Sequence, residues 1–186
     1  MGQIVMLSGG IDSLVCAELA REAGELRGCV FVDYGHPAQQ AEGWKAFAYC
    51  GEREVPLRAV HVFGLDLGDM GSAQGARVVP GRNAVLLAVG ANHAPEMGGT
   101  SVVLGATHSD HANYPDCRPG FFDAMTAALG VSVLAPLISM TKSEVVREAR
   151  RMGLKPSDAW SCYGAGPHPC GTCPSCTEAR KAWASL

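Results

Sequence analysis

Short apolar runs that alternate with amphipathic stretches constrain the fold of this chain more than any other feature of its sequence. The runs that predict strands are Ile4–Leu7, Cys29–Asp33, Ala59–Phe63, Ser101–Gly105 and Val131–Leu134. The segments between them predict helices over residues 12–23, 39–50, 83–93 and 120–129, and a further helix that ends at Gly153. Alternation at this spacing predicts an α/β fold, in which a doubly wound parallel sheet carries helices on both faces.

The length and composition suit one globular domain, which we place over residues 1–186. The chain has 186 residues, of which 47% are apolar and 18% are charged, and about 150 residues is an ordinary domain size. The formal net charge of −3 provides no broad basic surface for a phosphate backbone. We therefore expect small-molecule partners and no direct nucleic-acid partner.

No segment of the sequence has the length of a membrane span. The longest apolar run, Ala84–Ala91, is far shorter than the roughly 20 residues that a helix needs to cross a bilayer. No basic region precedes the first apolar run, so a signal peptide is not expected. Four cysteines stand alone and are expected to be buried free thiols of a cytoplasmic protein: Cys16, Cys29, Cys50 and Cys117.

The other four cysteines are gathered near the end of the chain in a pattern that predicts a metal site. Two residues separate Cys170 from Cys173 and Cys173 from Cys176, and Cys162 precedes them. This spacing lets tight turns point the thiolates at one ion, and Zn2+ accepts four thiolates in a tetrahedron. Disulfide pairing is the alternative, which a cytoplasmic setting opposes. We predict a structural zinc site that holds a helical subregion, residues 160–186, beside the functional site.

A glycine turn follows the first predicted strand and opens the first predicted helix, with the sequence Ser8-Gly9-Gly10-Ile11-Asp12-Ser13. Glycines let the backbone approach an anion closely, and the N–H groups and dipole of a helix start supply positive potential. The chain contains neither G-x-x-x-x-G-K-[ST] nor G-x-G-x-x-G, which disfavours a Walker NTPase and a dinucleotide-binding fold. The turn therefore predicts a phosphate site, with an ordinary capped Gly-Gly turn as the alternative.

The S-G-G-x-D-S pattern at this position resembles the loop of the PP-loop ATP pyrophosphatases, which release pyrophosphate and adenylate an oxygen of their substrate. The resemblance implies a Rossmann-like fold of the adenine nucleotide alpha hydrolase type and ATP as a substrate. It also implies that the pyrophosphate is bound by Ser8, Gly9, Gly10, Asp12 and Ser13. Asp12 is the expected ligand of Mg2+, directly or through water, because a hard cation that bridges phosphate oxygens needs a carboxylate nearby.

Further segments narrow the resemblance to the 7-cyano-7-deazaguanine (preQ0) synthases. In the family's order they are Val79-Pro80-Gly81-Arg82-Asn83, Gly105 with Asp110, Tyr114-Pro115-Asp116-Cys117-Arg118, Ser161-Cys162-Tyr163-Gly164, the last three cysteines and Arg180. The resemblance runs from Ile4 to about Trp183. It implies an ATP-dependent carbon–nitrogen ligase that converts 7-carboxy-7-deazaguanine and ammonia into preQ0 through adenylated acid and amide intermediates, in queuosine biosynthesis. Family members often form homodimers, so a homodimer is expected.

Two cations are expected to act on the phosphates or on the substrate carboxylate of this reaction. Arg82 follows a Pro-Gly turn, and Lys142 lies in the first turn of a helix that Thr141 and Glu144 begin as a capping box. A cation there opposes the helix dipole, which indicates an anionic contact, although an ordinary solvated lysine is the alternative. The expected catalytic residues are Asp12, Lys142 and Arg82. No side-chain nucleophile is expected, because the chemistry needs charge stabilisation and positioning.

The loop after the fourth predicted strand is expected to bind the ring of the substrate. Carboxylates on Asp110 and Asp116 can accept hydrogen bonds from the N1–H and 2-amino donors of a guanine-like edge. Arg118 completes the expected substrate-binding set, with a structural ion pair between Arg118 and Asp116 as the alternative. His108 and His111 flank Asp110 and are expected to be surface histidines rather than metal ligands.

The chain departs from the family pattern at several places, one of which is Pro174, which replaces an acidic residue between the last two cysteines. After the second predicted strand it has Tyr34-Gly35-His36-Pro37-Ala38 where the family has Tyr-Gly-Gln-Arg-His, and the acidic residue Glu42 falls one place later. The Gly-rich segment Leu65–Val79, a candidate lid, is shorter than in the family. A shorter lid excludes less water, so a relative that stops at the amide or joins the carboxylate to another amine is an alternative. A non-catalytic zinc-containing nucleotide-binding module is a second alternative. A tRNA-thiolating enzyme is a third, but it needs a reactive cysteine and a basic surface, and the acidic net charge opposes it.

Overall fold

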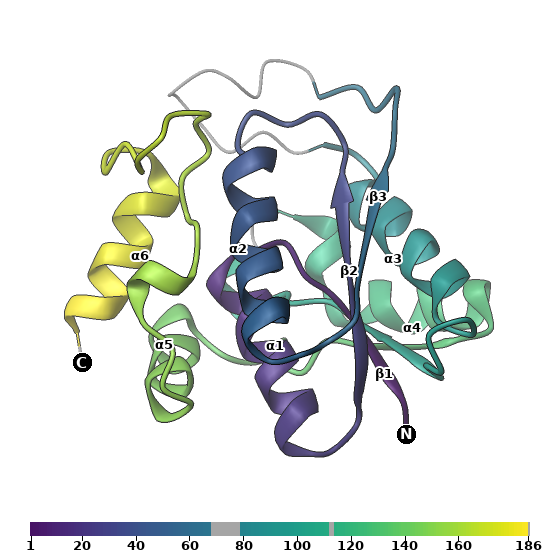
Figure 1. Cartoon of the computed structure of the whole chain (residues 1–186). Helices are drawn as coiled ribbons and strands as arrows, with labels where there is room; N and C mark the ends of the chain where they lie inside the picture. Colours follow the sequence, from purple (N-terminus) through teal and green to yellow (C-terminus); the bar gives the residue numbers. More distant parts are fainter. Residues whose placement is uncertain (68–78, 112–113, 186) are drawn as a thin grey trace.

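A five-stranded parallel sheet forms the centre of the molecule (Figure 1). The computed structural model describes residues 1–67, 79–111 and 114–185. The strands are β1 (Gln3–Met6), β2 (Leu26–Asp33), β3 (Leu57–His61), β4 (Ser101–Val103) and β5 (Ser132–Leu134). Their order across the sheet is β3-β2-β1-β4-β5, and every adjacent pair is parallel. The predicted α/β fold class is confirmed.

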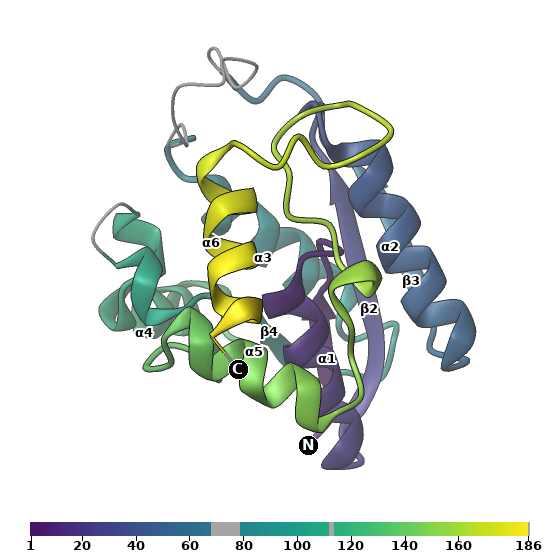
Figure 2. The same ribbon diagram turned by 90° about the vertical axis from the view of Figure 1, so that its left-hand side faces the viewer.

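Helices cover both faces of this sheet. The helices α1 (Ile11–Glu22), α2 (Gln39–Glu52) and α5 (Lys142–Arg151) pack on one face, and α3 (Arg82–His93) and α4 (Pro119–Leu129) pack on the other (Figure 1). The last helix, α6 (Pro174–Ala184), stands beside α5 (Figure 2). Single 3-10 turns occupy η1 (His108–Asp110), η2 (Pro115–Cys117) and η3 (Pro156–Asp158). Within the described part of the chain, no helix combines the length and apolar character that a bilayer crossing requires.

The central strand β1 is apolar after its first residue because both of its faces are buried. Along the first strand and the residue after it, Val5 and Leu7 pack under α1 and α5, whereas Ile4 and Met6 pack under α3. Successive side chains of a strand point to opposite faces, so one short run supplies both hydrophobic cores.

Two boundaries show how tertiary structure adjusts the local pattern. The third strand is Leu57–His61, two residues earlier than predicted, because it pairs with β2 from Cys29↔Leu57 to Asp33↔His61. Phe63, expected inside the strand, lies beyond it and is 91% exposed. The predicted lid falls mostly outside the described residues.

The predicted capping box at the start of α5 is confirmed. The Glu144 carboxylate accepts hydrogen bonds from the Thr141 N–H and hydroxyl at 2.7 and 2.8 Å, and the Glu144 N–H donates to the Thr141 hydroxyl at 3.4 Å. This box fixes the helix start that carries Lys142.

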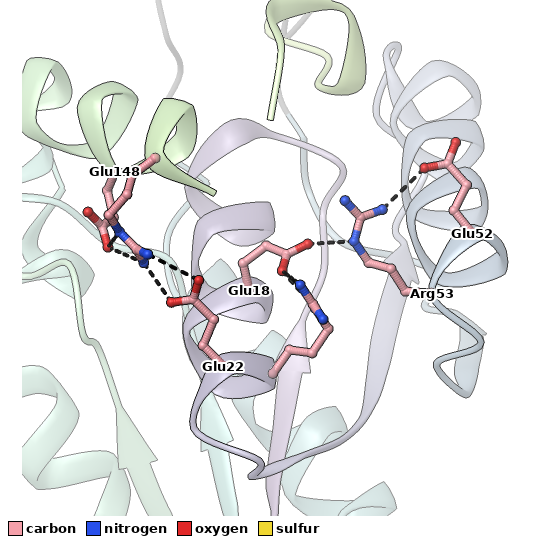
Figure 3. A network of polar contacts seen from close by, with 7 residues as sticks. Glu18, Glu22, Glu52, Arg53 and Glu148 are labelled. Atoms are coloured by element: carbon pink, nitrogen blue, oxygen red, sulfur yellow. Dashed lines mark hydrogen bonds and ion pairs between the residues drawn. The ribbon is translucent and has the colours of Figure 1, made fainter. Parts of the chain in front are cut away.

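A buried carboxylate ties α1 to the end of α2. Glu18 is 1% exposed and accepts hydrogen bonds from the guanidinium groups of Arg21 and Arg53 (Figure 3). The Arg53 guanidinium also lies 4.2 Å from the centre of the Tyr49 ring. Nearby, Arg151 of α5 pairs with Glu22 of α1 at 2.6 Å (Figure 3). These contacts hold the helices that present the glycine turn.

Candidate active site

A cavity of about 300 Å3 opens at the carboxyl ends of β1 and β4. Leu7 and Ser8, which follow β1, and Leu104 and Gly105, which follow β4, line it. The strand order reverses between β1 and β4, with β2 and β3 on one side and β5 on the other. Open parallel sheets bind ligands at such a reversal, and the volume is within the range of small-molecule sites.

The glycine turn, residues 8–13, forms one wall of this cavity, and all of its residues except Gly9 line it. Gly9 has a φ of +77°, and a Cβ there would collide with the carbonyl oxygen of Glu42. The Ser13 hydroxyl donates to the Gly10 carbonyl at 2.8 Å, which closes the turn. Gly10 is the N-cap of α1 and supplies no side-chain cap, so N–H groups of the first helical turn are left for an anion.

The end of β4 lies directly against the start of α1. A Cβ on Gly105 would be 3.0 Å from the backbone carbon of Asp12 and the backbone nitrogen of Ser13. A side chain there would push the glycine turn away from the sheet. The close approach explains why a glycine stands at the end of this strand.

An ion pair joins the first turns of two helices at the cavity wall. Lys142 Nζ donates to both carboxylate oxygens of Asp12, at 2.8 and 2.6 Å, and the two side chains are 17% and 23% exposed. Burial opposes the charge of Lys142, but Asp12, with Asp110 and Glu178 beyond it, outweighs burial and raises the lysine pKa. The anionic contact expected of Lys142 is therefore present, and the solvated-lysine alternative is not what the structure shows.

Arg82 brings a second cation to the same cavity from the start of α3. Its guanidinium lies 3.4 Å from Asn83 Oδ1 through both Nε and Nη2. Burial opposes its charge, but the hydroxyl of Tyr34, which hydrogen-bonds to it, and the carboxylate of Asp116 raise the pKa of Arg82. Both predicted cations thus face one cavity together with Asp12.

The predicted substrate loop is only partly at the cavity. Asp110 lines it, and its Oδ2 accepts hydrogen bonds from the N–H and hydroxyl of Thr107 at 2.9 and 2.8 Å. Asp116 instead accepts the backbone N–H of Asn83 at 3.2 Å, and neither Asp116 nor Arg118 is among the described lining residues. Arg118 donates to the His111 carbonyl at 3.1 Å, and these two described residues, Arg118 and Asp116, form no ion pair with each other.

Sequence reasoning missed several groups of the cavity wall. They are the aromatic side chains of Tyr34, Tyr114, Trp160 and Tyr163 and the carboxylates of Glu42 and Glu178. Burial raises the pKa of Tyr163 to about 12 and that of Tyr114 in the same direction, so both phenols are neutral hydrogen-bonding groups. The three tyrosines lie inside matched motifs, which was a usable signal, whereas nothing in the pattern around Glu178 indicated a site.

Cys117 also lines the cavity as a neutral thiol. Burial and the nearby Asp110 raise its pKa to about 12. A thiol of this kind is a poor nucleophile. It does not supply the reactive cysteine that a thiolating enzyme needs.

The four clustered cysteines meet at one point. The Sγ atoms of Cys162, Cys170, Cys173 and Cys176 all lie within 4.8 Å of one another, and none is in a disulfide. A tetrahedral Zn2+ with bonds of about 2.3 Å sets its thiolates about 3.8 Å apart, which this arrangement fits. The N–H groups of Cys170 and Cys173 donate to Cys162 Sγ and Cys170 Sγ, each at 3.3 Å. Backbone donors lower the pKa of Cys170 to about 6, which favours the thiolate that binds metal.

The cysteine cluster packs against the helix that follows the second strand. Cys162, Cys173 and Cys176 share a small buried core with Trp160 and with Ala38 before α2. Four thiolates around one metal ion would leave no coordination position for a substrate.

Comparisons with known proteins find related sequences over almost the whole chain. A family model described as queuosine biosynthesis protein QueC matches residues 2–186. A 7-cyano-7-deazaguanine synthase from Synechococcus sp. (strain RCC307) is 35% identical over 199 residues, which cover 93% of this chain and 90% of that protein.

Two solved structures show the same fold at low identity. NMN synthetase from Francisella tularensis matches with a TM-score of 0.62 and 18% identity, over 90% of this chain and 69% of that one. The U34-tRNA thiolase NcsA from Methanococcus maripaludis, solved with a 4Fe–4S cluster, matches with a TM-score of 0.56 and 17% identity, over 100% of this chain and 65% of that one. The family match covers almost the whole sequence. The chain therefore belongs to the family of the queuosine biosynthesis protein QueC.

Proposed function

We propose that the chain is an ATP-dependent carbon–nitrogen ligase that converts 7-carboxy-7-deazaguanine and ammonia into 7-cyano-7-deazaguanine. Relatives that are 35% and 33% identical to it carry the name of that synthase. The observation that supports the proposal best is the composition of one cavity wall. The uncapped start of α1, the Asp12–Lys142 pair and Arg82 all meet there.

The proposed reaction activates one carbon twice. A carboxylate oxygen of the acid attacks the α-phosphorus of ATP and pyrophosphate leaves. Ammonia then attacks the acyl carbon, AMP leaves with the acyl oxygen, and a proton is lost to give the amide. The amide oxygen attacks a second ATP in the same way, with loss of pyrophosphate and one N–H proton. Loss of AMP and the remaining N–H proton gives the nitrile.

In this proposal the glycine turn binds the pyrophosphate portion of ATP. Backbone N–H groups of Gly9 and Gly10 and the hydroxyls of Ser8 and Ser13 are the donors, and the dipole of α1 favours the anion. Lys142 and Arg82 neutralise charge that develops as pyrophosphate leaves. Both cations keep their charge in the site, as their raised pKa values indicate.

Asp12 is the residue that would hold Mg2+. Its carboxylate is a hard oxygen donor at the cavity wall and is 23% exposed, so it suits this cation. The ion would neutralise phosphate oxygens while Lys142 orients the Asp12 carboxylate.

We assign the ring of the substrate to the side of the cavity lined by residues of η1 and η2. Asp110 and Tyr114 lie on the wall there. Asp116 and Arg118 shape the loop, since one binds the start of α3 and the other the His111 carbonyl.

We further propose Zn2+ as the ion of the cysteine cluster, and residues 160–186 as a zinc-binding subregion of one domain, residues 1–186. The Sγ separations favour a single ion over a larger cluster. The proposal includes a cytoplasmic homodimer with no direct nucleic-acid partner. The exposed aromatic rings of Trp44 and Phe47 on one face of α2 support the homodimer. The net charge of −3 supports the absence of a nucleic-acid partner.

The test is product analysis with the zinc-loaded chain, 7-carboxy-7-deazaguanine, ATP and ammonium. The proposal predicts AMP, pyrophosphate and the nitrile. A product heavier by one water identifies a ligase that stops at the amide. ATP binding without AMP release in the presence of the acid and ammonium identifies a non-catalytic nucleotide-binding module.

A further inference from the structure

Four acidic side chains line the cavity among the described residues: Asp12, Glu42, Asp110 and Glu178. Asp12 is bound through both oxygens to Lys142, and Asp110 accepts two hydrogen bonds from Thr107. Glu178 is exposed, and no described side chain orients it by a hydrogen bond or ion pair. In Glu42, as in Asp110, one oxygen is held and the other has no protein partner in the described part of the chain, but of the two only Glu42 is held by a buried ring that also contacts another side chain of the cavity wall.

The held oxygen belongs to a buried pair. Glu42 Oε2 lies 2.8 Å from His36 Nε2, and the two side chains are 22% and 5% exposed. The His36 ring stacks on the Tyr34 ring, with centroids 4.5 Å apart and planes 19° from parallel. Tyr34 itself lines the cavity. His36 thus connects two groups of the cavity wall although it is not part of that wall.

The backbone of Glu42 is fixed as well. Its carbonyl oxygen occupies the space where a Cβ on Gly9 would lie, so the first turn of α2 rests on the glycine turn. The carboxylate therefore has little freedom to leave the cavity. A preorganised acceptor of this kind is what selective recognition requires.

His36 is held at a cost that packing alone does not explain. Its Nδ1 atom is buried and has no hydrogen-bond partner among the described residues. Buried polar atoms are nearly always paired, and an unpaired one indicates a functional constraint on the side chain. The contacts of Nε2 with Glu42 and of the ring with Tyr34 supply that constraint.

We propose that Glu42 selects the substrate ring by accepting hydrogen bonds from two adjacent N–H donors, with His36 as the residue that positions it. This inference rests on the proposed function, whose acid carries such donors as the N1–H and 2-amino groups of its guanine-like edge. A carboxylate offers about four lone-pair sites, so Oε2 can serve both His36 and the ligand. Two parallel N–H···O bonds give geometric selectivity as well as affinity.

The inference assigns this edge of the ring to Glu42 and leaves Asp110 and Tyr114 to contact other parts of the ring. Asp116 is taken up by the backbone N–H of Asn83 and is not among the described lining residues. The Oδ2 atom of Asp110 already has two donors from Thr107. Asp110 Oδ1 has no protein partner, like Glu42 Oε1, but Asp110 is held only by its own turn, whereas His36 joins Glu42 to Tyr34 of the cavity wall.

Calorimetric binding to the full zinc-loaded chain tests the inference without turnover. The probes are 7-carboxy-7-deazaguanine, its analogue without the 2-amino group, and ATP, each alone. Glu42→Gln is expected to weaken binding of the acid by about 10- to 100-fold, because charge-assisted acceptors are lost. The preference for the acid over its analogue should disappear, while the ATP Kd stays unchanged. Glu52→Gln on the same helix, exposed and paired only with Arg53, is the matched control and should bind all three like the wild type.

His36 variants separate positioning from simple loss of structure. His36→Ala should reduce both affinity and preference for the acid, and His36→Gln, which keeps an N–H donor, should restore the preference. Unfolding melts identify any variant that fails to fold, and the Glu42 result stands independently. Equal binding of the acid by wild type and Glu42→Gln, or a loss confined to ATP, would overturn the inference alone. Absence of acid binding by the wild type, both alone and with ATP present, would overturn the proposed function with it.

Discussion

The backbone N–H of Trp160 donates a 2.9 Å hydrogen bond to the carbonyl oxygen of Gly9. The Trp160 ring is 8% exposed, packs with Cys162, Cys173 and Cys176, and donates through Nε1 to the Cys162 carbonyl at 2.9 Å. Trp160 therefore links the cysteine cluster directly to the glycine turn. A metal at the end of the chain can set the shape of a phosphate site near its start.

Loss of the metal should consequently disturb both stability and nucleotide binding. Cys173→Ala removes a buried ligand, and we expect less than one zinc per chain, a loss of several kcal/mol of stability (about the scale of structural zinc sites) and weaker ATP binding. Elemental analysis, thermal melts and calorimetry measure the three effects. Cys50→Ala, a buried cysteine outside the cluster, is the control and should keep its zinc. Visible absorbance of an iron–sulfur cluster in the native protein would contradict the assignment of zinc.

The Asp12–Lys142 pair leads to a prediction about the chemical step. Lys142→Met removes the cation that faces the leaving pyrophosphate, and comparable losses of a charge-stabilising group lower kcat by about 100-fold or more. Pyrophosphate release in the presence of acid and ammonium measures the effect. Lys181→Met, on the exposed face of α6, is the matched control. A Lys142→Met enzyme that releases pyrophosphate at the wild-type rate would refute the role of the pair.

The close approach at Gly9 is testable against a second glycine with the same backbone. Gly9 and Gly24 have φ values of +77° and +71°. A Cβ added at Gly9 would have neighbours within 4 Å, whereas one added at Gly24 would have none. Gly24→Ala should cost about 1–2 kcal/mol from left-handed strain alone and leave ATP affinity intact. Gly9→Ala should cost more and weaken ATP binding, because it displaces the first turn of α2. Equal effects on ATP affinity would show that the contact with Glu42 is unimportant.

The buried Glu18 provides a prediction about the scaffold (Figure 3). Glu18→Ala leaves Arg21 and Arg53 facing an empty buried site and should cost about 3 kcal/mol, the low end for breaking a buried pair, since both arginines keep some solvent contact. Glu22→Ala, which removes the more exposed pair with Arg151, should cost about 1 kcal/mol or less. Denaturant unfolding gives both values. Similar losses for the two variants would argue against the ranking by burial.

The capping box gives a pH-dependent prediction. Hydrogen bonds from the Thr141 backbone and hydroxyl lower the pKa of Glu144 below its ordinary 4.5. A carboxylate with a depressed folded-state pKa contributes stability that is present above the unfolded pKa and lost as pH falls through the folded value. Glu144→Gln should therefore melt at a lower temperature than wild type at neutral pH. The gap should close as pH drops below 4.5, and a gap that persists in acid would contradict the assignment.

The sequence pattern was sufficient for the layers, the glycine turn and the cysteine cluster, because each depends on spacing within a short segment. It was insufficient where the outcome depends on contacts between distant segments. The third strand shifted to follow β2, and Asp116 turned to the start of α3 instead of the cavity. Lys142 is instructive, since its unfavourable place on a helix indicated a partner, but only the fold identified Asp12. Glu42 became a site residue because α2 rests on Gly9, which no local pattern shows.

The central claim is that this cavity directs cleavage of ATP between its α and β phosphates, with transfer of the AMP portion to the deazapurine acid. Incubation of the zinc-loaded chain with α-labelled ATP, Mg2+, 7-carboxy-7-deazaguanine and ammonium measures it directly, with an Asp12→Ala chain in parallel. The account predicts labelled AMP that forms only when the acid is present, and none from the variant. Labelled ADP, or AMP formation that ignores the acid, would contradict it.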